Sequence, residues 1–184
     1  MRYYRLLDDI NYPERWYLGD ITEDDWLFTN GQKVDELQLG GNLCIALYQD
    51  GEPMDYTTNE AFSVPIVSQR IRTQLGDIHG LQFIHVKINA KEVNSNYFIM
   101  VATSKKNCVD EELSEFGKFV DNDPIRPDLA GHYSWFSKLV VDPSKINGED
   151  VFRIDKAVNY LVVSERIKEA IEDISSTGVK FIEV

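Results

Sequence analysis

A pattern that occurs twice constrains the fold of this chain more than any other sequence feature. Residues 64–86 read VPIVSQRIRTQLGDIHGLQFIHV, and residues 160–184 read YLVVSERIKEAIEDISSTGVKFIEV. Ser68 aligns with Ser164 and, after a short insertion, Phe83 aligns with Phe181. In both copies a β-branched run leads to a serine that can cap a helix, and a later glycine leads to a Phe-Ile-x-Val strand. The chain therefore contains two similar strand–helix–strand units.

The middle of each copy has the period of an amphipathic helix. Apolar residues recur at i, i+4 and i+7, which gives the helix one buried stripe and leaves its charged residues in water. We expect helices near residues 69–78 and 165–175. The side chains expected to be buried are Ile71, Leu75, Ile167 and Ile171 in the helices, and Phe181 and Val184 in the last strand. Two copies are too few for a solenoid, so they indicate either a duplication or two units on one sheet.

Further strands are expected in short segments rich in aromatic or β-branched residues. These segments are residues 2–7, 43–48, 97–103, 136–141 and 151–154. The strands outnumber the helices and do not alternate strictly with them, which argues against a doubly wound nucleotide-binding fold. The sequence therefore predicts one α+β domain over residues 1–184, with a mostly antiparallel or mixed sheet on which the two similar units pack.

The negative charge of the chain is concentrated near its N-terminus. The formal net charge is −12; residues 1–60 carry 4 Lys/Arg against 13 Asp/Glu, whereas residues 61–184 carry 15 against 18. Such a field repels nucleic acid and anionic membrane surfaces and speeds encounters with basic partners. Acidity of this size also serves solubility alone. Its concentration in residues 1–60, ahead of a scaffold in residues 61–184, points to a partner.

The expected compartment is the cytoplasm. Charged residues near Met1 interrupt any secretory signal. The longest apolar run, Leu43 to Tyr48, is far shorter than the roughly 20 residues of a membrane helix. Cys44 and Cys108 each stand beside apolar residues, which is typical of reduced core thiols.

The sequence contains no recognisable catalytic, cofactor or metal motif. It has no Walker loop, no G-x-G-x-x-G, no G-x-S-x-G, no C-x-x-C and no H-E-x-x-H. Its histidines, His79, His85 and His132, are scattered, and its adjacent carboxylates are expected to point apart into water. The stretch from Asp121 to Asp123 lacks the glycine and distal glutamate of a calcium loop. We therefore predict no enzyme activity, no cofactor and no metal.

Acids and large aromatic residues alternate between Trp16 and Phe28. Exposed aromatics surrounded by carboxylates are typical of a hot spot for a basic protein partner. The residues predicted to bind a partner are Asp20, Glu23, Asp24, Asp25 and Trp26. The alternative is that Trp16 and Trp26 are core residues under a long loop. Reversing the charges of Asp24 and Asp25 is expected to leave folding intact, because loop carboxylates are usually solvated.

A series of short motifs runs in a fixed order along the whole chain. The motifs are the Tyr-Tyr-Arg-Leu opening, Trp16-Tyr17-Leu18-Gly19, Pro53-Met54-Asp55, Pro65-Ile66-Val67-Ser68, Tyr97-Phe98-Ile99, Cys108-Val109-Asp110, the Val-Ser-Glu-x-hydrophobic-Lys-Glu run of residues 163–169 and the Gly-x-x-Phe of residues 178–181. In this order they resemble immunity protein family 11 of bacterial polymorphic toxin systems. The resemblance runs from residue 1 to residue 184, and it brings no catalytic residues with it.

The resemblance implies a small cytoplasmic protein, encoded next to a toxin, that neutralises the toxin by stoichiometric binding. The expected partner is a basic toxin that acts in the cytosol, and a nuclease would fit because its basic groove can be filled by an acidic protein. No direct binding to nucleic acid or membranes is expected, and the oligomeric state is not predicted. The alternatives are a generic acidic interaction or regulatory domain and, less favoured, an enzyme with an unrecognised site.

Overall fold

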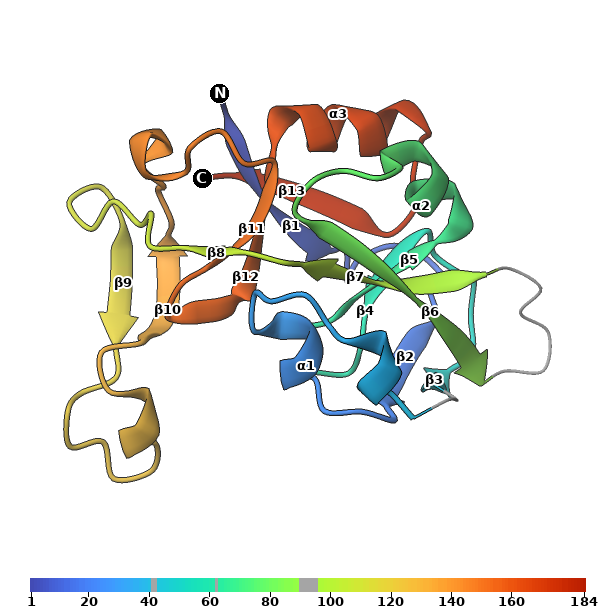
Figure 1. Ribbon diagram of the computed structural model, residues 1–184, viewed down its shortest axis with the longest axis horizontal. Coiled ribbons are helices and arrows are strands. Elements are labelled where there is room, and N and C mark those ends of the chain that lie inside the picture. Colours follow the sequence, from blue (N-terminus) through green and yellow to red (C-terminus); the bar gives the residue numbers. More distant parts are fainter. Residues whose placement is uncertain (41–42, 62, 90–95) are drawn as a thin grey trace.

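The computed structural model describes residues 1–40, 43–61, 63–89 and 96–184, which form two main sheets, a two-stranded ribbon and short helices (Figure 1). The six-stranded sheet has the order β2 (Tyr17–Ile21), β3 (Cys44–Gln49), β6 (Leu81–Asn89), β7 (Tyr97–Ala102), β5 (Pro65–Ser68) and β4 (Tyr56–Thr58). The five-stranded sheet has the order β13 (Val179–Glu183), β1 (Tyr3–Asp8), β12 (Ala157–Ser164), β11 (Val151–Ile154) and β8 (Lys105–Lys106).

The remaining elements are short. The ribbon pairs β9 (Glu115–Lys118) with β10 (Tyr133–Lys138). The helices are α1 (Trp26–Thr29), α2 (Gln69–Leu75) and α3 (Glu165–Asp173), and single 3₁₀ turns lie at Glu36–Gln38, Pro127–Leu129 and Pro143–Lys145. In the two main sheets the pairs β3–β6 and β8–β11 are parallel and the other described pairs are antiparallel. The predicted α+β class with mostly antiparallel or mixed sheets is confirmed.

The two sequence copies occupy equivalent places in different sheets. The first copy forms β5, α2 and β6, with β7 between the two strands; the second forms β12, α3 and β13, with β1 between them. The strand registers also match. The equivalent partners are Ser68–Tyr97 and Phe83–Met100 in one sheet, and Ser164–Tyr3 and Phe181–Leu6 in the other. The two units therefore lie on two sheets and not on one, and β1 plays the part in the second unit that β7 plays in the first.

The helices begin at an equivalent cluster of three side chains. Ser68 donates its hydroxyl to Asp55 Oδ1 (2.7 Å), and Ser164 donates to Asp150 Oδ1 (2.6 Å). An arginine two residues after each serine, Arg70 or Arg166, forms an ion pair with the same aspartate. Ser164 also caps α3 by accepting the N–H of Ile167, whereas Ser68 makes no such bond. Ser68 therefore occupies the predicted N-cap position of α2, but the predicted side-chain cap bond is absent there.

The predicted helical stripes are confirmed. Their four residues are between 0% and 4% exposed, and they pack against Tyr4, Leu6 and Met100 where the two helices meet both sheets. Helix α2 ends earlier than expected, because Gly76 leaves the helical region at φ 59°. The later glycines still matter. At Gly178 (φ 77°) a Cβ would stand 2.3 Å from the Tyr56 carbonyl oxygen, so this strand entry requires glycine.

The remaining expectations are met in part. Four strand predictions fall on β1, β3, β7 and β11, whereas the segment 136–141 overlaps the end of β10 and continues into the core as Leu139 and Val141. Strand β13 is an edge strand, so Phe181 and Val184 are only partly buried against the core. Cys108 is buried, but Cys44 is half-buried; both are free thiols. Phe181, Val184 and Cys44 are therefore less buried than predicted.

Candidate functional site

The predicted partner-binding residues lie at the end of β2 and the start of α1. Asp20 and Asp24 are exposed, Glu23 and Asp25 are half-buried, and Trp26 is 55% exposed. Figure 1 shows α1 on the part of the molecule away from α2 and α3, where it contacts β7. In the short helix α1, Trp26 and Leu27 are exposed, whereas Phe28 and Thr29 are buried. One strand end and the turn before α1 thus expose two carboxylates, and the first residue of α1 exposes an indole.

Two of the predicted carboxylates are engaged in the fold. Asp25 Oδ2 accepts hydrogen bonds from Asn59 Nδ2 (2.7 Å) and Ser63 Oγ (3.3 Å). Glu23 Oε1 accepts the N–H of Gly40 at 3.3 Å. The expectation that Asp25 is merely solvated is wrong, because this carboxylate ties α1 to a distant loop. Asp24 accepts the N–H of Trp26 within its own turn (2.9 Å) and stays exposed.

The two tryptophans of this segment have opposite environments. Trp16 is 1% exposed and packs against the ring of Tyr97, with centroids 5.1 Å apart. Phe28 is fully buried in the same core. The core alternative is therefore correct for Trp16 and wrong for Trp26.

A second group of exposed apolar residues lies on the ribbon, which projects from the body in Figure 1, and in the segments that precede and connect its two strands. Its exposed side chains are Leu113, Val120, Ile125 and Trp135, and Trp135 is 53% exposed. The Asp123 carboxylate accepts the N–H groups of Arg126 and Ile125, and these bonds lower its pKa. Asp123 thus closes a turn. The sequence analysis did not predict these exposed residues, because the pairing of β9 with β10 has no local sequence motif.

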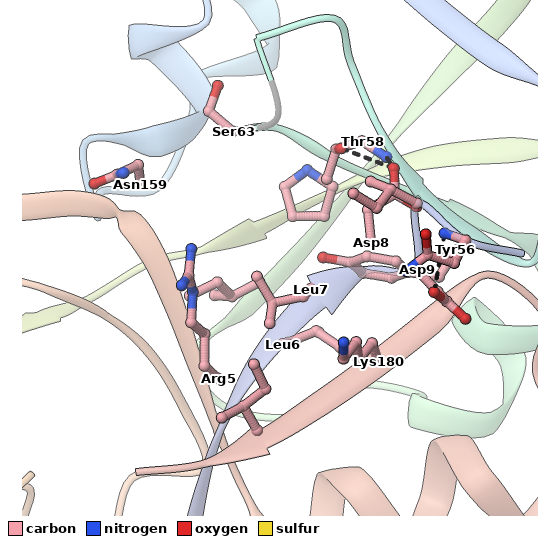
Figure 2. Close-up of a pocket in the computed structure, with 15 residues that line it drawn as sticks. Arg5, Leu6, Leu7, Asp8, Asp9, Tyr56, Thr58, Ser63, Asn159 and Lys180 are labelled. Atoms are coloured by element: carbon pink, nitrogen blue, oxygen red, sulfur yellow. Dashed lines mark hydrogen bonds between the residues drawn. The ribbon is translucent and has the colours of Figure 1, made fainter. Parts of the chain in front are cut away.

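A pocket of about 360 Å³ lies where the two main sheets meet (Figure 2). One side is formed by β1 and β13, and the other by β4, the start of β5 and the residues before it. The residues that line it include Arg5, Leu7, Tyr56, Pro65, Lys180 and Ile182. Sequence reasoning missed this pocket as well. A cation flanked by apolar or aromatic residues in each of two strands, Arg5 and Lys180, is the signal that could have revealed it.

A buried ion pair closes the pocket at one end. Arg15 donates through Nη1 and Nη2 to the two oxygens of Asp8, at 2.5 and 2.7 Å, and both side chains are at most 4% exposed. Thr58 gives the same carboxylate its N–H (3.2 Å) and its hydroxyl (3.0 Å). Arg15 further donates to the carbonyls of Asp9 and Trp16. Asp8 and Arg15 are therefore neutralised by each other and hold β1 to β4.

The described residues bring no metal-binding cluster together. Within the ranges given above, no group of three or more His, Cys, Asp or Glu side chains could hold a metal ion. Burial raises the pKa of the Cys108 thiol to about 12, so its thiolate is not available at neutral pH. Among the described helices, none is long and apolar enough to cross a membrane.

These features define an acidic α+β protein with an exposed tryptophan on α1 and a pocket between its two main sheets. Residues 33–184 match the model of the immunity protein family Imm11. The chain belongs to this immunity protein family, as the resemblance predicted. A search of curated proteins finds no match. The match begins after Trp26, so the predicted partner-binding residues precede the part of the chain that the family model covers.

Proposed function

We propose that this chain neutralises a cognate bacterial toxin in the cytosol by forming a stoichiometric complex with it. Membership of an immunity protein family is the observation that carries the proposal. The surface chemistry supports binding as the mechanism, because an exposed tryptophan in a segment with exposed carboxylates is typical of a protein interface.

The proposed contact surface is the segment that contains Asp20, Glu23, Asp24, Asp25 and Trp26. Asp20, Asp24 and Trp26 are exposed and would meet the toxin directly. Asp25 and Glu23 would act indirectly, by fixing the turn that presents them. This segment precedes the region matched by the family model. A surface that selects one toxin has to differ between family members, and a segment outside the shared region can do so.

The proposed toxin is basic. The chain carries a net charge of −12, and residues 1–60 contribute most of it. An oppositely charged groove, such as that of a nuclease, would gain in encounter rate and in selectivity from this field. The competing functions are a regulatory interaction domain and an enzyme that reverses the toxin's modification.

Coexpression with the toxin of a neighbouring gene tests the proposal. The chain should restore growth of the host, and the two proteins should elute together as a one-to-one complex. Restored growth without a complex would instead support the enzymatic alternative. A toxin that forms no complex and remains active would contradict the proposed function.

Two exposed tryptophans provide a matched test of the surface. Trp26 and Trp135 are 55% and 53% exposed and lie on different parts of the molecule. Trp26→Ala should weaken toxin binding by at least about 2 kcal/mol if Trp26 is a hot spot. Trp135→Ala should leave affinity unchanged. The opposite result would move the binding surface to the ribbon.

A further inference from the structure

The pocket lies over a face that is filled core in the equivalent unit. Arg5 pairs with Ile182 across β1 and β13, and the equivalent pair in the first unit is Ile99 with Ile84 across β7 and β6. Ile99 and Ile84 are 0% and 3% exposed, whereas Ile182 is 45% exposed. The first unit therefore covers this surface with its own chain. The second unit leaves the equivalent surface open, and Arg5 lines it.

Two cations of this face have no carboxylate partner in the described part of the chain. Arg5 and Lys180 both line the pocket, and neither is in an ion pair there. The guanidinium of Arg5 lies 4.0 Å from the ring centroid of Tyr160, and its buried Nε has no hydrogen-bond acceptor. Burial lowers the pKa of Arg5. An enclosed cation without a counter-charge is destabilising unless something supplies one.

A second guanidinium lies behind the pocket wall. Arg153 is fully buried, its Nη2 donates to the carbonyl of Ser63 (3.1 Å), and its Nε has no acceptor among the described residues. Tyr56, which lines the pocket, lies near both arginines. Burial and Asp8 raise the pKa of Tyr56, and the charges of Arg153 and Arg5 oppose them. The wall at Tyr56 therefore lies within reach of the charges of both guanidinium groups and of Asp8.

The carboxylates of the pocket do not cancel this charge. Asp8 is neutralised by Arg15. Asp9 remains at the rim, where its Oδ1 accepts the N–H of Asn11 at 3.2 Å. In a chain with a net charge of −12, a pocket lined by a half-buried and an exposed cation, neither of them in a described ion pair, points to an anionic ligand.

We propose that this pocket binds an organic carboxylate. The carboxylate group meets Arg5 and Lys180, because a guanidinium fork matches the two oxygens of a carboxylate. The apolar body lies against Leu7 and Ile182, in the space that core side chains occupy in the first unit. The volume of about 360 Å³ suits a short acid or the end of a polypeptide. This site is separate from the α1 surface and does not depend on the proposed function.

Titration with sodium hexanoate tests the proposal, with hexanamide as the uncharged probe of the same length. Hexanoate should produce saturable NMR shifts at the β1 and β13 amides and bind more tightly than hexanamide. Arg5→Gln and Lys180→Gln should each weaken hexanoate binding by about tenfold or more. Lys180 is exposed, so its variant should fold even if the Arg5 variant does not. Lys87→Gln, at an exposed position on β6, is the charge control and should bind normally.

The source of the carboxylate is distinguished by a second pair of probes. Acetyl-Gly-Gly-Ala-Leu with a free C-terminus is compared with the same peptide carrying a C-terminal amide. Tighter binding of the free acid than of hexanoate assigns the pocket to a polypeptide terminus, and weaker binding assigns it to a small acid. Equal binding of hexanoate and hexanamide, or normal hexanoate binding by Lys180→Gln, would overturn the proposal.

Discussion

At the scale of single residues, two tryptophans from the same acidic segment should respond differently to the same change. Trp16→Ala removes a buried indole and should lower the free energy of unfolding by about 3–5 kcal/mol. Trp26→Ala removes an exposed indole and should change stability by no more than about 0.5 kcal/mol. Urea denaturation measures both values. A large loss for Trp26→Ala would mean that this side chain supports the fold.

The pair Asp8–Arg15 provides a second test at this scale. Arg15→Met leaves the Asp8 carboxylate buried without its cation, which should cost about 3–5 kcal/mol of stability. Asp8→Leu combined with Arg15→Met removes both charges and should be more stable than Arg15→Met alone. It should not regain full stability, because Thr58 loses its acceptor. Additive losses in a double-mutant cycle would show that the two charges do not interact.

At the scale of secondary-structure elements, the Asp150 cluster makes the start of α3 sensitive to acid. Burial raises the pKa of Asp150, but hydrogen bonds from Arg166 and Ser164 outweigh it, and the net pKa is lowered. The contribution of ionised Asp150 to the free energy of unfolding is therefore fully present above the ordinary aspartate pKa of about 3.9. It is lost as the pH falls through the lowered pKa of Asp150 in the folded protein.

Arg166→Gln should therefore be less stable than the parent at neutral pH, and the difference should vanish at the acid end. Free energies of unfolding, measured by urea denaturation between pH 7 and about pH 2, test this expectation. Arg126→Gln is the control, because its ion pair with Asp128 is exposed and should contribute little at any pH. A difference for Arg166→Gln that stays constant to the lowest pH would contradict the assigned cause.

How much the sequence could predict depended on how local each signal was. The stripe of Ile167 and Ile171 is local, since one face of one helix decides it, and both residues are buried. Strand β4 has three residues and β8 has two, so their pairing depends on distant partners and gives no periodic signal. The same limit applies to the site. Exposure of Trp26 and the position of Arg5 and Lys180 on one pocket are set by chain packing that no motif encodes.

At the scale of the whole molecule, the matched units predict that the chain can be permuted. The N–H of Val184 donates to the carbonyl of Tyr3 at 3.0 Å, so the C-terminal strand ends beside the first strand. In the first unit the equivalent strands, β6 and β7, follow each other in the chain. A short Gly/Ser linker from Val184 to Met1, with new ends between Asp121 and Asn122, should preserve both sheets.

The permuted chain should melt within about 4 °C of the parent, which corresponds to about 1 kcal/mol for a chain of this size. New ends between Ile66 and Val67 provide the control, because they interrupt β5 inside a sheet and should prevent folding. Circular dichroism and thermal melting distinguish the two chains. If the permutant opened at Asp121 failed to fold, the proposed equivalence of β13–β1 and β6–β7 would be wrong, because the linker would not be able to join β13 to β1 as the chain joins β6 to β7.

The last prediction concerns the electric field that guides association. Asp20→Lys with Asp24→Lys replaces two negative charges by two positive ones, so the net charge changes from −12 to −8. Glu169→Lys with Asp173→Lys, at exposed positions on α3, makes the same change on another part of the surface.

If the α1 surface meets the toxin, the first pair should slow association and reduce its salt dependence more than the second. Stopped-flow association at about 0.01 M and about 1 M salt, where the screening length is about 30 Å and 3 Å, measures both effects. Dissociation should change less, because steering acts on the encounter. Equal slowing by the two pairs would mean that only the net charge affects association, and the proposal that the α1 surface contacts the toxin would be contradicted.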